Sequence, residues 1–159
     1  MPSAVDAMDI FLNSIRQNVD DIRQSDVDGN TTTFRASQSY WIDEGWVVER
    51  WKNYGVPQIG VFAAGGGVIA EGRSTHSERY EQKIFLVDIF ASGKDQRGYL
   101  TEQVKDAFLL TPQRMSLLSS GLKVDKLLSE VDIIDDDILE GRVYRKQLTF
   151  RTIFRASGS

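Results

Sequence analysis

The segment Glu81–Ala91 (EQKIFLVDIFA) constrains the fold more than any other part of this sequence. Apolar residues occupy both of its alternating sets of positions, namely Ile84, Phe85, Leu86, Val87, Ile89 and Phe90. Because successive side chains of a strand point to opposite faces of a sheet, this strand is apolar on both faces. We therefore expect it to occupy a central position in a sheet.

The C-terminal segment, residues 141–156, predicts a long strand with one packed face. Its even-numbered positions are mostly apolar and are interrupted by Lys146 and Thr152. Its odd-numbered positions form a polar and basic face that includes Arg145, Arg151 and Arg155. This two-residue period is typical of a strand that lies between a core and a polar surface.

Apolar residues at helical spacing predict three helices. The first lies near the N-terminus, and its apolar face comprises Met8, Phe11, Leu12, Ile15, Val19 and Ile22. The second covers residues 99–110, with a stripe of Leu100, Val104, Ala107, Phe108 and Leu110. A third, short helix can begin at Pro112 and end at Gly121. Two further strands are predicted at residues 56–63 and 131–134, and residues 31–55 fit one or two more.

These elements predict an α+β fold: a mostly antiparallel sheet flanked by helices on one face, with a β-hairpin extension. We expect one domain, residues 1–159, because a chain of 159 residues can bury its own core. The net charge of −4 implies no bulk attraction to nucleic acid, and the lack of cysteine excludes disulfides and thiol chemistry. No apolar run approaches the roughly 20 residues of a membrane helix.

Three consecutive glycines, Gly65, Gly66 and Gly67, follow a predicted strand and raise the question of a phosphate-binding loop. Such a loop requires a helix directly after it, because the helix N-terminus directs N–H groups at the anion. Residues 68–82 lack helical apolar spacing. We therefore interpret the glycines as a flexible part of a β-hairpin, a contact arm that becomes ordered against a partner.

Two acidic segments raise the question of a metal site. In the first, DVDGN at residues 26–30, a calcium-loop alignment puts Gln24 and Arg35 at the first and last ligand positions, where carboxylates belong. The second group consists of Asp135, Asp136, Asp137 and Glu140. Its carboxylates lie almost consecutively in the sequence, so they diverge instead of meeting in a cleft. We predict no metal site, and interpret the second group as a solvated turn or an electrostatic contact surface.

Other side chains with possible chemistry have simpler interpretations. His76 lies near Ser74 and Ser77, but the G-x-S-x-G turn of a hydrolase nucleophile is missing, so a surface-loop histidine is favoured. The tryptophans Trp41, Trp46 and Trp51 are interspersed with acids that would repel phosphate, which favours a core or a protein interface over base stacking. We predict no catalytic residue and no cofactor, and therefore no enzyme.

The order of charges near the C-terminus predicts a contact between subunits. Residues 130–140 carry six acids and no base, whereas residues 141–155 carry five bases and no acid. Opposite patches on adjacent elements suit a surface that meets a second copy head to tail, although both patches could simply be solvated. In the first case, Arg145, Arg151 or Arg155 of one subunit would meet the acids at 135–137 or Glu140 of the next.

The order of elements resembles that of the tail terminator, or tail-to-head joining, proteins of tailed phages. The shared pattern is an amphipathic N-terminal helix followed by VPQIGVF, a glycine-bearing hairpin, KIFLVDIFA leading into GYLTEQVKDAFL, and VYRKQLTFRTIF. It covers most of residues 5–156, and the Trp-rich section 41–51 is longer than in a minimal member of this family. The resemblance implies an α+β subunit of a hexameric ring that ends tail-tube polymerisation and joins the tail to the neck.

This resemblance also implies partners and a location. The partners would be further copies of the chain, the major tail tube protein and a neck or head-completion protein. The location would be the tail or neck of the virion, after assembly in the host cytoplasm. No membrane and no sequence-specific nucleic acid is implied, although DNA could pass through the ring lumen. The alternatives are another neck, connector or tube component, and a small ligand-binding α+β domain with its pocket under the Trp cluster.

Overall fold

A computed structural model of the chain describes residues 7–19, 22–25, 31–34, 41–45, 47, 57–71, 78–91, 93–133 and 144–157. The described part is built around a five-stranded sheet of order β3-β4-β5-β7-β6. Its strands are β3 (Ile42–Glu44), β4 (Gln58–Glu71), β5 (Glu78–Ala91), β6 (Leu122–Ile133) and β7 (Tyr144–Ser157). Strand β3 is parallel to β4, and every other pairing in this sheet is antiparallel. A separate antiparallel pair joins β1 (Ile22–Ser25) to β2 (Thr31–Phe34).

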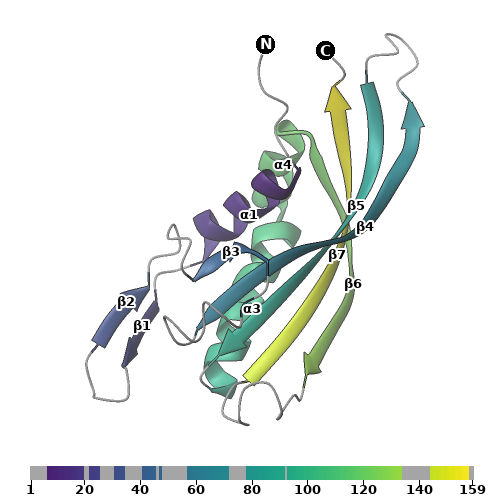
Figure 1. Cartoon of the computed structure of the whole chain (residues 1–159). Helices are drawn as coiled ribbons and strands as arrows, with labels where there is room; N and C mark the ends of the chain where they lie inside the picture. Colours follow the sequence, from purple (N-terminus) through teal and green to yellow (C-terminus); the bar gives the residue numbers. More distant parts are fainter. Residues whose placement is uncertain are drawn as a thin grey trace.

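Three helices cover one face of the large sheet, as Figure 1 shows: α1 (Ala7–Asn18), α3 (Lys94–Leu109) and α4 (Thr111–Ser119). The predicted α+β class, with a mostly antiparallel sheet and helices on one face, is confirmed. The apolar strand β5 is the central strand, as its two apolar faces predict.

An aromatic group forms the middle of the core between the helices and the sheet. The ring of Phe11 on α1 stacks on Phe108 of α3 at 4.0 Å and on Phe85 of β5 at 4.4 Å between ring centroids. Phe150 of β7 meets Phe11 edge-on at 5.8 Å. All four side chains are at most 1% exposed, so one layer of rings ties α1 and α3 to strands β5 and β7.

The opposite face of the sheet carries a second, polar buried group. Asp88 and Phe90 alternate along β5 with Val87 and Ile89, which belong to the main core, so they point away from the helices. Asp88 and Phe90 are each 1% exposed and Gln58 is 0% exposed. Within the described residues, the side-chain amide of Gln58 has no hydrogen-bond partner.

The three predicted helices are present at the predicted positions, but their first and last residues differ from the prediction. Helix α1 ends at Asn18, and Ile22 lies in strand β1 instead of on the helix. Helix α3 begins at Lys94, five residues before the predicted start, because the polar run before Tyr99 gave no apolar stripe. Leu110 does not continue that stripe: it lies between α3 and α4 and is 48% exposed. Gly121, which the sequence places at the end of α4, has a φ of +94°, a conformation that favours glycine.

The strand predictions were right in order and wrong in length. Strand β4 continues to Glu71, well past the predicted end at residue 63. Strand β6 spans Leu122–Ile133, whereas only residues 131–134 were predicted. The register of β6 shifts twice, between Val124 and Lys126 and between Leu127 and Ser129. Each shift breaks the two-residue period by which a strand is recognised in a sequence.

Trp41 is fully buried within the main core cluster, directly before β3. This position agrees with a core role for that tryptophan. Trp46, Trp51, the DVDGN segment at 26–30 and His76 lie outside the described residues.

Candidate assembly surface

The three glycines of the predicted contact arm lie inside strand β4. Gly65, Gly66 and Gly67 pair with residues 84, 83 and 82 of β5, and the register shifts on both sides of them, between Ala63 and Gly65 and between Val68 and Ala70. The strand continues after the glycines to Glu71, so the strand setting that the sequence predicts for them is confirmed, and the strand-to-helix geometry of a phosphate-binding loop does not occur at the glycines. The turn of the β4–β5 hairpin follows Glu71, and the glycines belong to a bulged arm of it.

The acids at the centre of the interface prediction, Asp135, Asp136, Asp137 and Glu140, lie outside the described residues. Their predicted role therefore stays a prediction. The basic residues predicted to meet them are described, and the structure places each of the three differently.

Arg145 is buried and paired within its own chain. It is 8% exposed, and its Nη2 donates to the carboxylate of Asp88 at 3.1 Å. Its guanidinium also lies over the ring of Phe90, 5.0 Å from the centroid. Gln147 donates to the other oxygen of Asp88 at 3.1 Å. Arg145 thus belongs to the buried polar group on the second face of the sheet, and it is not open to a neighbouring subunit.

Arg151 and Arg155 lie on the same face of β7 as Gln147, four and eight residues farther along the strand. Arg151 donates to the carboxylate of Asp125 on β6, so it too has a partner within the chain. Arg155 is exposed, and within the described residues its side chain forms no ion pair. Of the three predicted basic contacts, Arg155 is the one that stays open.

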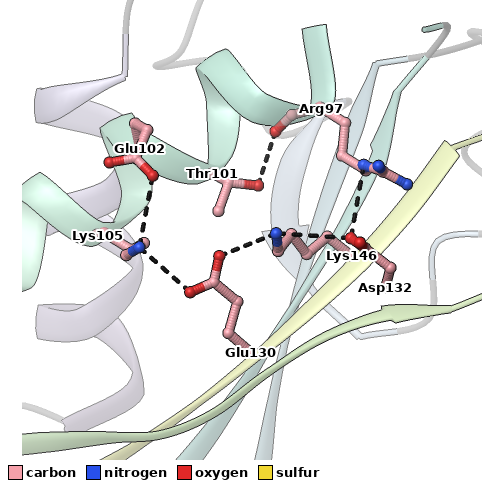
Figure 2. Close-up of polar contacts among 7 residues, drawn as sticks. All are labelled: Arg97, Thr101, Glu102, Lys105, Glu130, Asp132 and Lys146. Carbon is pink, nitrogen blue, oxygen red and sulfur yellow. Dashed lines mark hydrogen bonds and ion pairs between the residues drawn. The ribbon is translucent and has the colours of Figure 1, made fainter. Parts of the chain in front are cut away.

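Two of the acids before the turn also find partners inside the subunit. Figure 2 shows a chain of ion pairs that links α3, β6 and β7 through Glu130 and Asp132. Lys146 Nζ lies 2.9 Å from Glu130 Oε1 and 3.5 Å from Asp132 Oδ1, Lys105 Nζ lies 3.2 Å from Glu130 Oε2, and Arg97 Nε lies 3.6 Å from Asp132 Oδ1. We call these five residues the helix–strand network.

The helix–strand network shifts the titration of its two central groups. The hydrogen bond from Lys146 lowers the pKa of Glu130 from its ordinary value of 4.5, helped by Lys105 and opposed by partial burial. The hydrogen bond to Glu130 raises the pKa of Lys105 from 10.5. Both shifts favour the charged forms, so the network holds α3 against the β6–β7 hairpin at neutral pH.

Strand β6 forms an edge of the sheet, and its outer side pairs with no other strand in the described part of the chain. Near its start, Arg114 of α4 covers this edge: its Nη2 donates to the carbonyl oxygens of Val124 at 2.8 Å and Asp125 at 3.3 Å. Beyond the second register shift, within the described residues, no backbone hydrogen bond from outside the β6–β7 pair reaches the strand. Among the described residues, the half that ends at Ile133 is therefore an open edge of the sheet.

Large apolar side chains are exposed along this open half. Leu128 is 41% exposed and Val131 is 50% exposed. Single exposed apolar residues are common on protein surfaces, but these two flank a stretch of strand edge with unpaired backbone groups. An added strand or a neighbouring subunit can pair with the free backbone groups of such an edge and cover the apolar side chains beside it.

A groove of 590 Å³ lies between α1 and α4 and is lined by uncharged residues, among them Asn13, Gln17, Asn18, Gln113 and Ser116. Its lining does not include Trp41, the one tryptophan of the Trp cluster that the structure describes, and the ligand site predicted beneath that cluster stays a prediction. The described residues contain no group of three or more His, Cys, Asp or Glu side chains that could hold a metal ion. Likewise, no helix in the described part of the chain is long and apolar enough to cross a membrane.

No protein-family model matches the chain, and no curated protein sequence matches it.

The sequence patterns predicted only the last part of edge strand β6 and did not indicate residues 122–130 or the role of Arg114. They also missed Asp88, the acid that pairs with Arg145. A signal for Asp88 was present, because an acid inside a strand that is apolar on both faces must be paired when it is buried. No comparable signal marks Arg114, since its partners are backbone carbonyls that every residue carries.

Proposed function

We propose that this protein is a structural virion protein, a tail terminator whose subunits form a homohexameric ring that caps the phage tail tube and joins it to the neck. The observation that carries the proposal is the open half of β6, an unpaired sheet edge flanked by the exposed Leu128 and Val131. An edge of this kind on an otherwise self-paired sheet is suited to association with another subunit.

Three further features support an assembly role. The described charges near the open edge are largely paired inside the subunit, so the chain can present a fixed surface without large rearrangement. The β4–β5 hairpin projects beyond the helices in Figure 1 and supplies a second surface, separate from β6. A ring subunit needs two kinds of surface, one for its neighbours in the ring and one for the stacked tube or neck.

The order of elements supports the terminator role over the other virion roles. The N-terminal helix, the long hairpin, the central apolar strand, the following helix and the long terminal strand occur in the order that the resemblance implies. An open sheet edge would also suit another neck, connector or tube component. Such a component differs from a tail terminator in the virion proteins that it binds.

Purified protein, alone and mixed with tail tubes, tests the proposal by light scattering and negative-stain microscopy. We expect rings of six subunits that bind one end of the tubes and stop their growth. A chain that stays monomeric at high concentration would rule out the ring. Rings that ignore tube ends and bind isolated neck complexes would indicate another connector component.

The groove between α1 and α4 favours a second candidate, a small ligand-binding domain. Its size lies within the roughly 300–1,000 Å³ of ligand pockets, and its amide and hydroxyl lining suits an uncharged polar ligand. A monomer whose melting temperature rises with such a ligand, and no longer does so after Gln17→Leu and Gln113→Leu, would favour this candidate over the ring.

A further inference from the structure

We infer that the surface formed by Lys123, Lys126 and Arg155, here called the basic corner, binds the acidic segment 134–140 of a second copy of this chain. The inference deepens the proposed function, and it depends on that function only for the presence of the second copy.

The basic corner lies on one face of the sheet at one end of the β6–β7 pair. Lys123 is the partner of Ile153 and Lys126 is the partner of Arg151. Cross-strand partners share a face, and Arg151, Ile153 and Arg155 alternate along β7, so all of these residues point away from the helices. The backbone N–H of Arg155 donates to the carbonyl of Gly121 at 2.9 Å, which fixes Arg155 beside the start of β6.

The three cations of the basic corner are open to a partner. Lys123, Lys126 and Arg155 are all exposed, and within the described residues none of them forms an ion pair. Arg114 adds a fourth positive charge at the adjoining edge, where it binds backbone carbonyls and no carboxylate. By contrast, Arg145, Lys146 and Arg151 all have carboxylate partners within the chain.

The charges of the chain leave a matching acidic set. Of the six acids in residues 130–140, Glu130 and Asp132 are engaged in the helix–strand network. The other four are Asp135, Asp136, Asp137 and Glu140. By sequence, these four negative charges match the positive charges of the basic corner and Arg114, which is the charge complementarity expected of a specific contact.

The acidic segment cannot span the whole basic corner of its own chain, so a contact with all three cations forms between two copies. Lys123 lies ten residues before Ile133 along β6, a distance of about 33 Å at the rise of a strand. Residues 134–143 connect Ile133 to Tyr144, and a fully extended connection of this length spans at most about 40 Å. Travel to Lys123 and back requires about 66 Å, whereas Lys126 lies only seven residues before Ile133.

A protein partner fits the basic corner better than nucleic acid. The carboxylate of Asp125 lies within this surface, paired with Arg151, and would repel phosphate. The exposed Leu128, at the start of the open half of β6, lies two residues beyond Lys126 of the basic corner. The segment 134–140 offers Ile134, Ile138 and Leu139 beside its acids, so it can satisfy both the charged and the apolar part. Because the corner and the acidic segment are different surfaces, repeated contacts run head to tail and can close into a ring.

Zero-length carbodiimide cross-linking tests the contact, because it joins a lysine amine to a carboxylate only when the two touch. We would mix ¹⁴N- and ¹⁵N-labelled wild-type chains, cross-link the assembly and analyse the peptides by mass spectrometry. We expect mixed-isotope links between Lys123 or Lys126 and the acids of 134–140. Links found only within single-isotope chains would overturn the inference.

Charge reversal supplies the second test. Lys123→Glu, Lys126→Glu and Arg155→Glu together should weaken self-association about tenfold or more at about 50 mM salt and less at high salt, since exposed pairs are individually weak and are screened. Asp135→Lys, Asp136→Lys and Asp137→Lys should have a similar effect, and all six changes combined should restore association. The control is Lys94→Glu, an exposed lysine at the start of α3 with no ion pair within the described residues.

The outcomes separate this contact from the proposed function. If the triple variant of the basic corner forms rings as well as the wild type does, and its melting temperature is unchanged, the contact is overturned and the ring role stands. A wild-type chain that stays monomeric and ignores tail tubes would overturn the ring role itself. Binding of a short DNA duplex that is lost on reversal, while self-association is unchanged, would assign the basic corner to nucleic acid and overturn the inference.

Discussion

Phe11 is the residue at which the helical layer and the sheet meet. Its ring stacks on Phe108 and Phe85 and meets Phe150 edge-on. Interiors are packed to crystal-like density, so the loss of one ring in such a group leaves a space that the remaining rings fill only partly.

For this reason Phe108→Ala should lower the free energy of unfolding by about 3–5 kcal/mol. The control on the same helix is Tyr99→Ala, because Tyr99 is 50% exposed and its truncation should change stability by less than about 1 kcal/mol. Urea denaturation of both variants measures the difference. Equal losses would mean that α3 does not pack through Phe108.

Removal of Arg145 alone from its ion pair with Asp88 should lower the free energy of unfolding substantially. The Asp88 side chain is 1% exposed, so Arg145→Met leaves a buried carboxylate without its cation and should cost about 3–5 kcal/mol. Arg151→Met removes the more exposed partner of Asp125 and should cost less than about 1 kcal/mol. Chemical denaturation compares the two, and similar small losses would show that Asp88 is solvated.

At the scale of elements, the periodicity of apolar residues predicts the order of most strands and helices. It does not predict which charged side chains form ion pairs with one another. The acids before residue 141 and the bases after it suggested a contact between subunits. The antiparallel β6–β7 register instead places Asp132 opposite Lys146 within one chain. Any acidic segment followed by a turn and a basic strand can pair in this way, so charge order alone cannot separate the two cases.

The first nine residues of strand β6, residues 122–130, escaped prediction for a local reason. The two register shifts of β6 disrupt the alternation of apolar residues, and its exposed half carries Glu130, Asp132 and Val131 without a clear apolar face. Its position at the edge is set by tertiary pairing with β7, which no local pattern encodes. The basic corner was missed with it, because Lys123 and Lys126 had no assigned strand to place them.

Two glycines at different elements should respond oppositely to alanine. Gly121 has a φ of +94° at the end of α4, so Gly121→Ala should destabilise the protein by about 1–2 kcal/mol. Gly98 lies inside α3, where an added Cβ meets no atom within 4 Å, so Gly98→Ala should stabilise by about 0.5–1 kcal/mol. Thermal melting measures both. A stabilising Gly121→Ala would show that α4 ends in another conformation.

The helix–strand network should contribute stability that depends on pH. The pKa of Glu130 is lowered in the folded chain, so its contribution is present above its ordinary value of 4.5 and is lost as the pH falls through the lower folded value. The difference in unfolding free energy between wild type and Glu130→Gln, at most about 1 kcal/mol, should therefore shrink in acid. The control is Glu102→Gln, whose side chain is 67% exposed, and at neutral pH it should change the unfolding free energy less than Glu130→Gln does.

At the scale of the whole molecule, the open half of β6 is the surface whose loss should matter most for assembly. Leu128→Lys with Val131→Lys places two charges on this half, and these should weaken self-association while leaving the fold intact, because both side chains are already exposed. Met115→Lys on α4, at a residue that is 58% exposed, is the matched control. Light scattering across a concentration series reports the change. Association that survives the double variant would move the interface away from β6.

The partial cover that Arg114 gives to β6 has a consequence for unwanted growth. A sheet edge that is free along its whole length can template chain after chain and lead to fibres. Here the guanidinium occupies carbonyl oxygens at Val124 and Asp125, so an incoming strand can align with only part of the edge. Such a protein can accept a neighbour and still resist amyloid-like stacking, and a chain without Arg114 should be the more prone to aggregate on storage.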